Sequence, residues 1–148
     1  MANGKGKSVP PKATNRQQAK VVKTNQNQLI QKVGKPSWQF STVDKAGPFA
    51  WPKGSPEESA IVEKLHSLDS MTWAEIQGKQ HHSLSVSSLS TEAVKRLEEI
   101  KLDDEIDNLF SFHLQGKPRI ICIRHNDLAY LLWHDPYHKV APSKKKHT

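Results

Sequence analysis

The densest group of side chains capable of chemistry follows an apolar segment near the C-terminus. It is the run His134-Asp135-Pro136-Tyr137-His138-Lys139, and the cations Lys117, Arg119 and Arg124 precede it in the sequence. Metal-free cleavage of RNA needs a group that takes the 2′-hydroxyl proton, a positive charge beside the phosphate and a group that protonates the 5′-oxygen. An Arg beside a His or Tyr can supply these functions, since the pKa of a free imidazole is near neutral. The alternative is structural: Asp135-Pro136 is also typical of a turn, in which the histidines only cover the sheet edge.

The number of histidines raises the question of a metal site. His81, His82, His113, His134 and His138 offer enough imidazoles. However, Pro136 prevents His134 and His138 from forming a helical i, i+4 pair. The single cysteine, Cys122, lies in an apolar run, which favours a buried thiol over a ligand. Without a recognisable ligand spacing, the sequence predicts neither a metal nor another cofactor.

Three strands are expected to position the C-terminal cluster. Phe110, Phe112 and Leu114 recur with a period of two, and 115–118 has the composition of a turn. Apolar strands are predicted at 119–124 and 128–133, joined by a second turn at 125–127, and a short strand at 83–86 could join them. In such an antiparallel meander, Arg119 and His134 lie at one end of the sheet. Arg124 and His125 lie at the opposite end.

Three helices are predicted before this meander. Ser55 and Glu58 form a capping box with Pro56 in the first turn, and apolar residues follow on one face as far as Leu68. A second box spans 72–75, and a third helix opens at 90–92. The expected fold is α+β, with helices on one face of a small antiparallel meander. Trp133 is expected to be buried with Phe110 or Phe112.

Charge and composition divide the chain. Residues 1–54 contain ten Lys or Arg and one acid, residues 55–138 contain eight against fourteen, and residues 139–148 contain four and no acid. The hydrophobic fraction of 35% is also low for one fully folded domain. We therefore predict a disordered basic arm at 1–35, a single domain at 36–142 and a basic tail at 143–148. Four aromatic residues in the first part of this domain should form an irregular strap on the core: Trp38, Phe40, Phe49 and Trp51.

The sequence gives no indication of membrane or secretory targeting. No apolar run approaches the roughly 18 residues that a membrane span needs, and the basic N-terminus lacks the apolar segment of a secretory signal. Together with a single cysteine, these features predict a cytoplasmic protein with no membrane partner.

Several segments resemble a widespread group of uncharacterised bacterial proteins. The resemblance runs from about Trp38 to the C-terminus and is most specific in the C-terminal half. It is carried by the segments 73–76, 81–84, 92–97, 109–120 and 131–140. Members of the group typically carry a Leu-Trp-Trp-Asp-Pro-x-His-x-Val pattern and a short Pro-Ser-x-Lys-Lys-His tail, here residues 142–147. This chain has His134 where a second Trp is common, and Trp cannot transfer protons.

The order of helices and strands, with Arg119 opening the second meander strand, is also similar to toxins of the RelE/ParE superfamily. This similarity implies ribosome-dependent mRNA cleavage or gyrase inhibition, with RNA or the ribosome and a cognate antitoxin as partners. Carried onto this chain, it implies catalytic roles for Lys117, Arg119, Tyr137 and His138. Arg124 is a weaker match.

Two other classes of function stay open. A nucleic-acid-binding or adaptor module without catalysis would use the basic arms, because neutralising phosphates with Lys and Arg releases counterions. The residues expected to contact nucleic acid are Arg124, Lys139, Lys144, Lys145 and Lys146. The third class is a purely structural or partner-binding domain.

Overall fold

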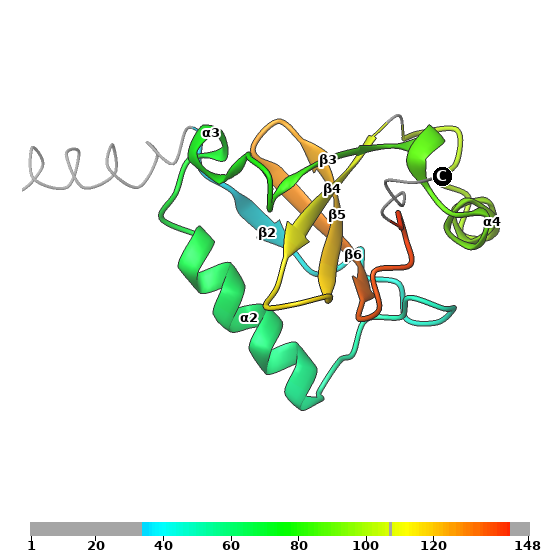
Figure 1. The fold of residues 1–148 in the computed structure, drawn as a ribbon, viewed down its shortest axis with the longest axis horizontal. Helices are drawn as coiled ribbons and strands as arrows, with labels where there is room; N and C mark the ends of the chain where they lie inside the picture. The colour runs from blue at the N-terminus through cyan, green and yellow to red at the C-terminus, as the bar shows by residue number, and fades with distance from the viewer. Residues whose placement is uncertain (1–33, 107, 143–148) are drawn as a thin grey trace, which may run out of the picture. The chain divides into compact units, whose positions relative to one another are not determined.

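The computed structural model describes residues 34–106 and 108–142, so the predicted basic arm, except Gly34 and Lys35, and the predicted tail lie outside the described residues. The fold of this part is α+β, as expected, with a five-stranded sheet in the order β2-β6-β5-β4-β3 (Figure 1). No helix of the described ranges is long and apolar enough to cross a membrane. The elements are β2 (Ser37–Gln39), α2 (Pro56–Leu68), α3 (Trp73–Ile76), β3 (His82–Ser85), the 3₁₀-helix η1 (Val86–Ser88), α4 (Thr91–Glu99), β4 (Asn108–His113), β5 (Arg119–His125) and β6 (Leu128–Asp135).

The predicted antiparallel meander is confirmed. β4 pairs with β5 and β5 with β6, both antiparallel, and β3 adds a fourth strand beside β4. The prediction of an irregular strap is wrong for Ser37–Gln39, which forms β2 parallel to β6 and makes the sheet mixed. Three residues are too few for a periodic pattern, and the strand forms because the edge of β6 is available for pairing. Phe49 and Trp51 are buried, as the strap prediction required.

The helices begin where the sequence indicates. The Ser55 hydroxyl accepts from the N–H of Glu58, Thr72 and Glu75 form a reciprocal capping box, and Ser90 caps α4. One detail differs at α2, because the Glu58 carboxylate does not reach the N–H of Ser55. It accepts instead from the Gly54 N–H at 2.8 Å and from Trp51 Nε1 at 2.7 Å. The first turn of α2 therefore also holds the strap against the domain.

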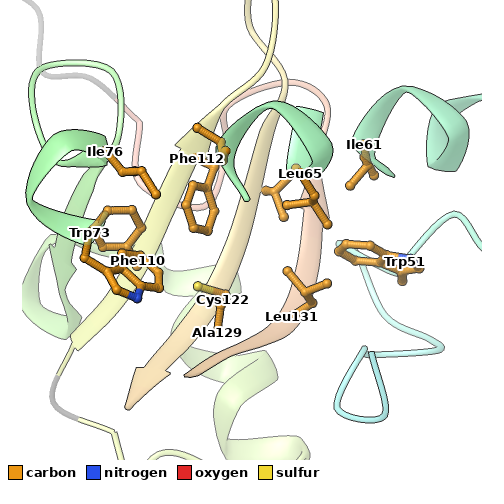
Figure 2. Close-up of a cluster of buried hydrophobic side chains, with 12 residues drawn as sticks. Trp51, Ile61, Leu65, Trp73, Ile76, Phe110, Phe112, Cys122, Ala129 and Leu131 are labelled. Carbon is orange, nitrogen blue, oxygen red and sulfur yellow. The ribbon is translucent and has the colours of Figure 1, made fainter. Parts of the chain in front are cut away.

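Helices cover both faces of the sheet, so the prediction that they pack on one face is wrong. α2 and α3 cover one face, where Ile61, Leu65 and Trp73 belong to one buried cluster with Phe110 and Phe112 (Figure 2). On the other face α4 packs against a second cluster, and the ribbon view places α2 and α4 on opposite sides of the strands (Figure 1). The cause is visible in the strands themselves: continuous apolar runs such as Ile120-Ile121-Cys122 have side chains on both faces, and both must be buried.

Trp133 is fully buried, as predicted, but not with Phe110 or Phe112. It belongs to the cluster on the α4 face, where its ring centroid lies 5.2 Å from that of Phe49. A shift of register between β5 and β6 explains this placement. Ile121 pairs with Trp133 and Cys122 with Leu131, which leaves Leu132 as an extra residue. Leu132 and Trp133 consequently face the same side, although they are consecutive.

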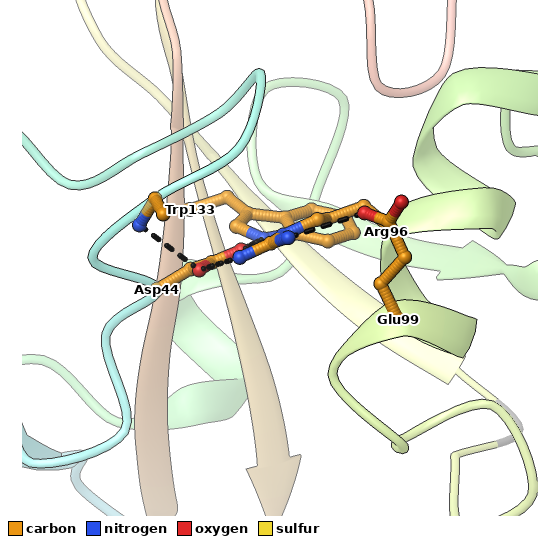
Figure 3. A network of polar contacts seen from close by, with 5 residues as sticks. Asp44, Arg96, Glu99 and Trp133 are labelled. Carbon is orange, nitrogen blue, oxygen red and sulfur yellow. Dashed lines mark hydrogen bonds and ion pairs between the residues drawn. The ribbon is translucent and has the colours of Figure 1, made fainter.

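A polar network ties the strap to α4 and β6 (Figure 3). The buried Asp44 carboxylate accepts from Arg96 Nε at 2.8 Å, from a second Arg96 nitrogen at 2.7 Å and from Trp133 Nε1 at 2.9 Å. Burial alone would raise the pKa of Asp44, but these hydrogen bonds outweigh it and lower the pKa. Gly47 permits the approach, because its φ is +84° and a Cβ there would lie 2.5 Å from Arg96 Nε.

Candidate functional site

Three polar side chains form a row across one end of the sheet. Arg119 opens β5 and pairs directly with His113 of β4 on one side and with Asp135 of β6 on the other. Directly paired residues point to the same face of a sheet. The row therefore lies on the face that α4 covers. The prediction that the start of the second meander strand meets the end of the third is confirmed.

The row lines a cleft of about 840 Å³. The floor is the sheet, and the walls are β3 with the following serines Ser87 and Ser88 on one side and the C-terminal segment 138–142 on the other. Seven side chains in this cleft matter for chemistry: Lys79, His82, Ser111, His113, Arg119, Asp135 and His138.

The Arg119 guanidinium is anchored at one end and open at the other. One terminal nitrogen donates to the backbone carbonyls of Gly116, Lys117 and Pro118 at 2.8, 2.6 and 3.1 Å. Its Nε and its second terminal nitrogen have no hydrogen-bond partner among the described residues. Burial lowers the pKa of Arg119, against the opposing effect of Asp135, yet a guanidinium stays charged at neutral pH. The side chain can therefore offer a fixed pair of donors to an anion.

Asp135 positions His138. Its carboxylate is 1% exposed and accepts from the backbone N–H groups of Lys139 and Val140, both at 2.8 Å. Val140 is itself fully buried, so the turn is fixed at both ends. His138 lies within the turn with φ of +58°, a conformation that costs free energy for a residue with a side chain. The Asp135-Pro136 sequence is thus a turn, as its composition indicated, and this turn carries His138 to the cleft.

The imidazoles of His113 and His138 share an electrostatic environment. Burial lowers the pKa of His113, the charges of Arg119 and Lys64 and the protonated form of His138 add to this effect, and a hydrogen bond to the backbone of Gly116 opposes it. Burial also lowers the pKa of His138, with Arg119 and His82 adding to it and Asp135 opposing it. Both imidazoles are consequently neutral at pH 7. A neutral imidazole can accept a proton, so each is suited to act as a general base.

Lys117 and Tyr137, which the RelE/ParE similarity also implies, do not line this cleft. Lys117 is exposed on the turn between β4 and β5, and its carbonyl anchors Arg119. Tyr137 is 70% exposed, and Lys139 lies over its ring at 5.7 Å. Lys144, Lys145 and Lys146 lie outside the described residues. The structure therefore brings together Arg119 and His138 from the expected set.

Arg124 lies at the opposite end of β5, as the meander predicted. Its guanidinium carbon is 4.1 Å from the centre of the Trp73 ring, and its Nε donates to the Asn126 carbonyl at 2.9 Å. These contacts give it a structural role beside α3. The structure thus separates Arg124 from the cleft that contains Arg119.

Two further histidines have other surroundings. His134 pairs with Ile120 and so faces α2, where it lines a second cavity with Glu57. His81 is buried, and its Nδ1 accepts the backbone N–H of His113 at 3.0 Å. Burial lowers the pKa of His81 to about 4, which keeps this nitrogen unprotonated. No group of three or more His, Cys, Asp or Glu in the described ranges is arranged to hold a metal ion.

Sequence reasoning missed Ser111 as a functional candidate. It considered His82 and His113 only as metal ligands and Asp135 as part of the C-terminal cluster or of a turn. A signal for His113 was present, because the predicted turn 115–118 brings His113 within one residue of direct pairing with Arg119, and the structure pairs the two residues. Comparison of the chain with protein-family models, with curated proteins and with solved structures found no match.

Proposed function

We propose that this protein is a metal-independent ribonuclease of the toxin type, similar to the RelE/ParE superfamily, with mRNA as substrate. The observation that carries the proposal is the row of His113, Arg119 and Asp135 in one cleft with His138. Arg119 binds the scissile phosphate through its Nε and its free terminal nitrogen. Lys79, which also lines the cleft, adds a second positive charge.

The two imidazoles divide the proton transfers. One takes the proton of the 2′-hydroxyl while that oxygen attacks phosphorus, and the other gives a proton to the departing 5′-oxygen. The products are a 2′,3′-cyclic phosphate and a free 5′-hydroxyl. Binding of the phosphate anion raises the pKa of both imidazoles, so one can enter the reaction protonated. By this proposal the bacterial ribosome presents the mRNA, and a cognate antitoxin is the partner that controls the protein.

Induced expression with growth and RNA integrity as readouts tests the proposal, together with cleavage of RNA in vitro with and without ribosomes. Arg119→Ala and His138→Ala should each reduce cleavage by about 10²–10⁴-fold with the fold intact. Arg124→Ala is the matched control, because this cation belongs to the same strand but lies at its other end. Its cleavage rate should match that of the wild type.

A wild-type protein that neither slows growth nor degrades RNA, alone or with ribosomes, contradicts the enzyme proposal. The competing function, binding of nucleic acid without catalysis, then predicts salt-sensitive binding with no change in the length of the RNA. Intact RNA in the presence of bound protein would favour that function.

A further inference from the structure

Ser111 is a buried polar residue without an apparent structural role. Its side chain lies in the middle of β4 and the residue is only 4% exposed. No described residue forms a hydrogen bond with its hydroxyl, although its backbone has a partner on both sides, His82 of β3 and Ile121 of β5. A buried hydroxyl without a partner destabilises the folded state, so such groups usually have a function or a bound molecule.

The Ser111 hydroxyl is placed to meet a ligand. Ser111 lines the cleft, on the same face of β4 as His113 two residues further on. Two residues of a strand span about 7 Å, so Ser111 lies one row deeper than His113 and Arg119. Its direct partner on β3 is His82, which lines the same wall. A ligand whose anionic group binds Arg119 would therefore present its adjoining atoms to Ser111.

We propose that the Ser111 hydroxyl binds the ribose 2′-hydroxyl of the nucleotide whose 3′-phosphate binds Arg119. This inference rests on the proposed function, and it adds a residue that distinguishes RNA from DNA. A serine hydroxyl both donates and accepts, as does the 2′-hydroxyl that DNA lacks. The hydrogen bond satisfies the buried group and orients the 2′-oxygen toward the phosphorus. It makes Ser111 a specificity-determining residue that contacts the substrate.

The test uses nucleotides that cannot be cleaved: uridine 3′-monophosphate and 2′-deoxyuridine 3′-monophosphate, titrated into the full chain by calorimetry. The wild type should bind the ribonucleotide about 2- to 10-fold more tightly, the contribution of one neutral hydrogen bond. Ser111→Ala should bind both nucleotides with the affinity that the wild type has for the deoxynucleotide. Ser83→Ala is the control, because this serine pairs with Phe110 and faces the opposite side of the sheet. It should keep the wild-type preference.

The outcomes separate this inference from the proposed function. Equal binding of the two nucleotides by the wild type overturns the role of Ser111, as does a preference that survives in Ser111→Ala. Either result leaves the phosphate site on Arg119 in place. Binding of neither nucleotide at millimolar concentration overturns the phosphate site, and the role of Ser111 with it.

Discussion

Arg119 is held by its own turn and still has donors to offer. The carbonyls of residues 116–118 fix one terminal nitrogen, so the guanidinium is oriented before any ligand arrives. Preorganised donors of this kind contribute more to binding an oxyanion than mobile ones, because no reorganisation accompanies the reaction. The same charge is the common neighbour of His113 and His138, whose pKa values it lowers.

Replacement of Arg119 by Gln should raise the pKa of both imidazoles. The substitution removes a positive charge that disfavours their protonated forms, whereas burial continues to lower both pKa values. In the wild type without ligand, both imidazoles should titrate below pH 6.5, the ordinary value for His. In Arg119→Gln both titrations should move to higher pH. NMR titration of the ring protons measures the pKa values directly, and values that do not move would contradict this electrostatic coupling.

At the residue scale, the sequence identified which residues have side chains suited to catalysis, but not where those side chains point. Arg119 and His138 were predicted from their chemistry, and both line the cleft. Tyr137 was chosen in the same way, yet it is exposed, because neighbours in a turn point in different directions. The positive φ of His138 depends on the buried Asp135 carboxylate, a tertiary contact that no local pattern indicates.

At the scale of elements, capping residues located the three α-helices of the described residues because these signals are local. Ser55, Thr72 and Ser90 each use their side-chain oxygens as the sequence predicts. β2 was missed because its three residues depend on the edge of a strand about ninety residues later. The sequence also did not predict which face of the sheet α4 covers. An amphipathic stripe shows that one side of a helix is buried, but it does not show which surface of the protein buries it.

The ion pair between Asp44 and Arg96 connects the strap to α4, and substitution of either partner tests its contribution to stability. Asp44→Asn keeps the shape of the side chain but removes the charge, and it should destabilise the fold by about 3 kcal/mol, the lower end for breaking a buried ion pair. The lower end applies because the Arg96 side chain is 17% exposed. Urea unfolding measures the change. Glu99→Gln, which removes only the exposed partner of Arg96, should change stability by less than about 0.5 kcal/mol, and an equal loss in both variants would contradict the assignment.

The pKa of Asp44 also gives this link a pH dependence. Its folded-state pKa is lowered below the ordinary value of 3.8. The contribution of the pair is therefore complete above that pH and is lost as the pH falls through the folded-state value. In Asp44→Asn this part of the acid transition should be absent.

At the scale of the whole molecule, four imidazoles set the response to acid. Burial lowers the pKa of His81, His113, His134 and His138. At pH values between the lowered pKa of each folded-state imidazole and its ordinary pKa, the unfolded chain binds more protons than the folded one. The free energy of unfolding therefore falls as the pH decreases through this range. For His81 this window runs from the ordinary 6.5 down to about 4.

His81→Asn should remove part of this acid sensitivity. The amide oxygen of Asn can accept the His113 N–H as Nδ1 does, but it does not titrate in this range. Between pH 7 and pH 4.5, the melting temperature of the variant should decrease less than that of the wild type. Identical decreases would show that protonation of His81 does not contribute to acid unfolding.

The distribution of charge separates two contributions to RNA binding. Residues 1–33 contain seven Lys or Arg and no acid, whereas the cleft belongs to residues 79–142. Deletion of 1–33 should weaken binding of long RNA at low salt and make its salt dependence shallower, because fewer counterions are released. Cleavage of a dinucleotide should be unchanged. Loss of dinucleotide cleavage in the shortened chain would contradict a cleft that acts on its own.

The extra residue in β6 has a consequence for the chemistry of the cleft. If Leu132 were retained but paired with Ile121, every later side chain of the strand would exchange sides, so that Asp135 would face α2 and His134 would pair with Arg119. The unpaired position of Leu132 therefore determines whether the Asp135 carboxylate or the His134 imidazole lies beside the Arg119 guanidinium. It follows that deleting Leu132, which shortens the strand by one residue, would restore regular alternation while leaving Asp135 beside Arg119.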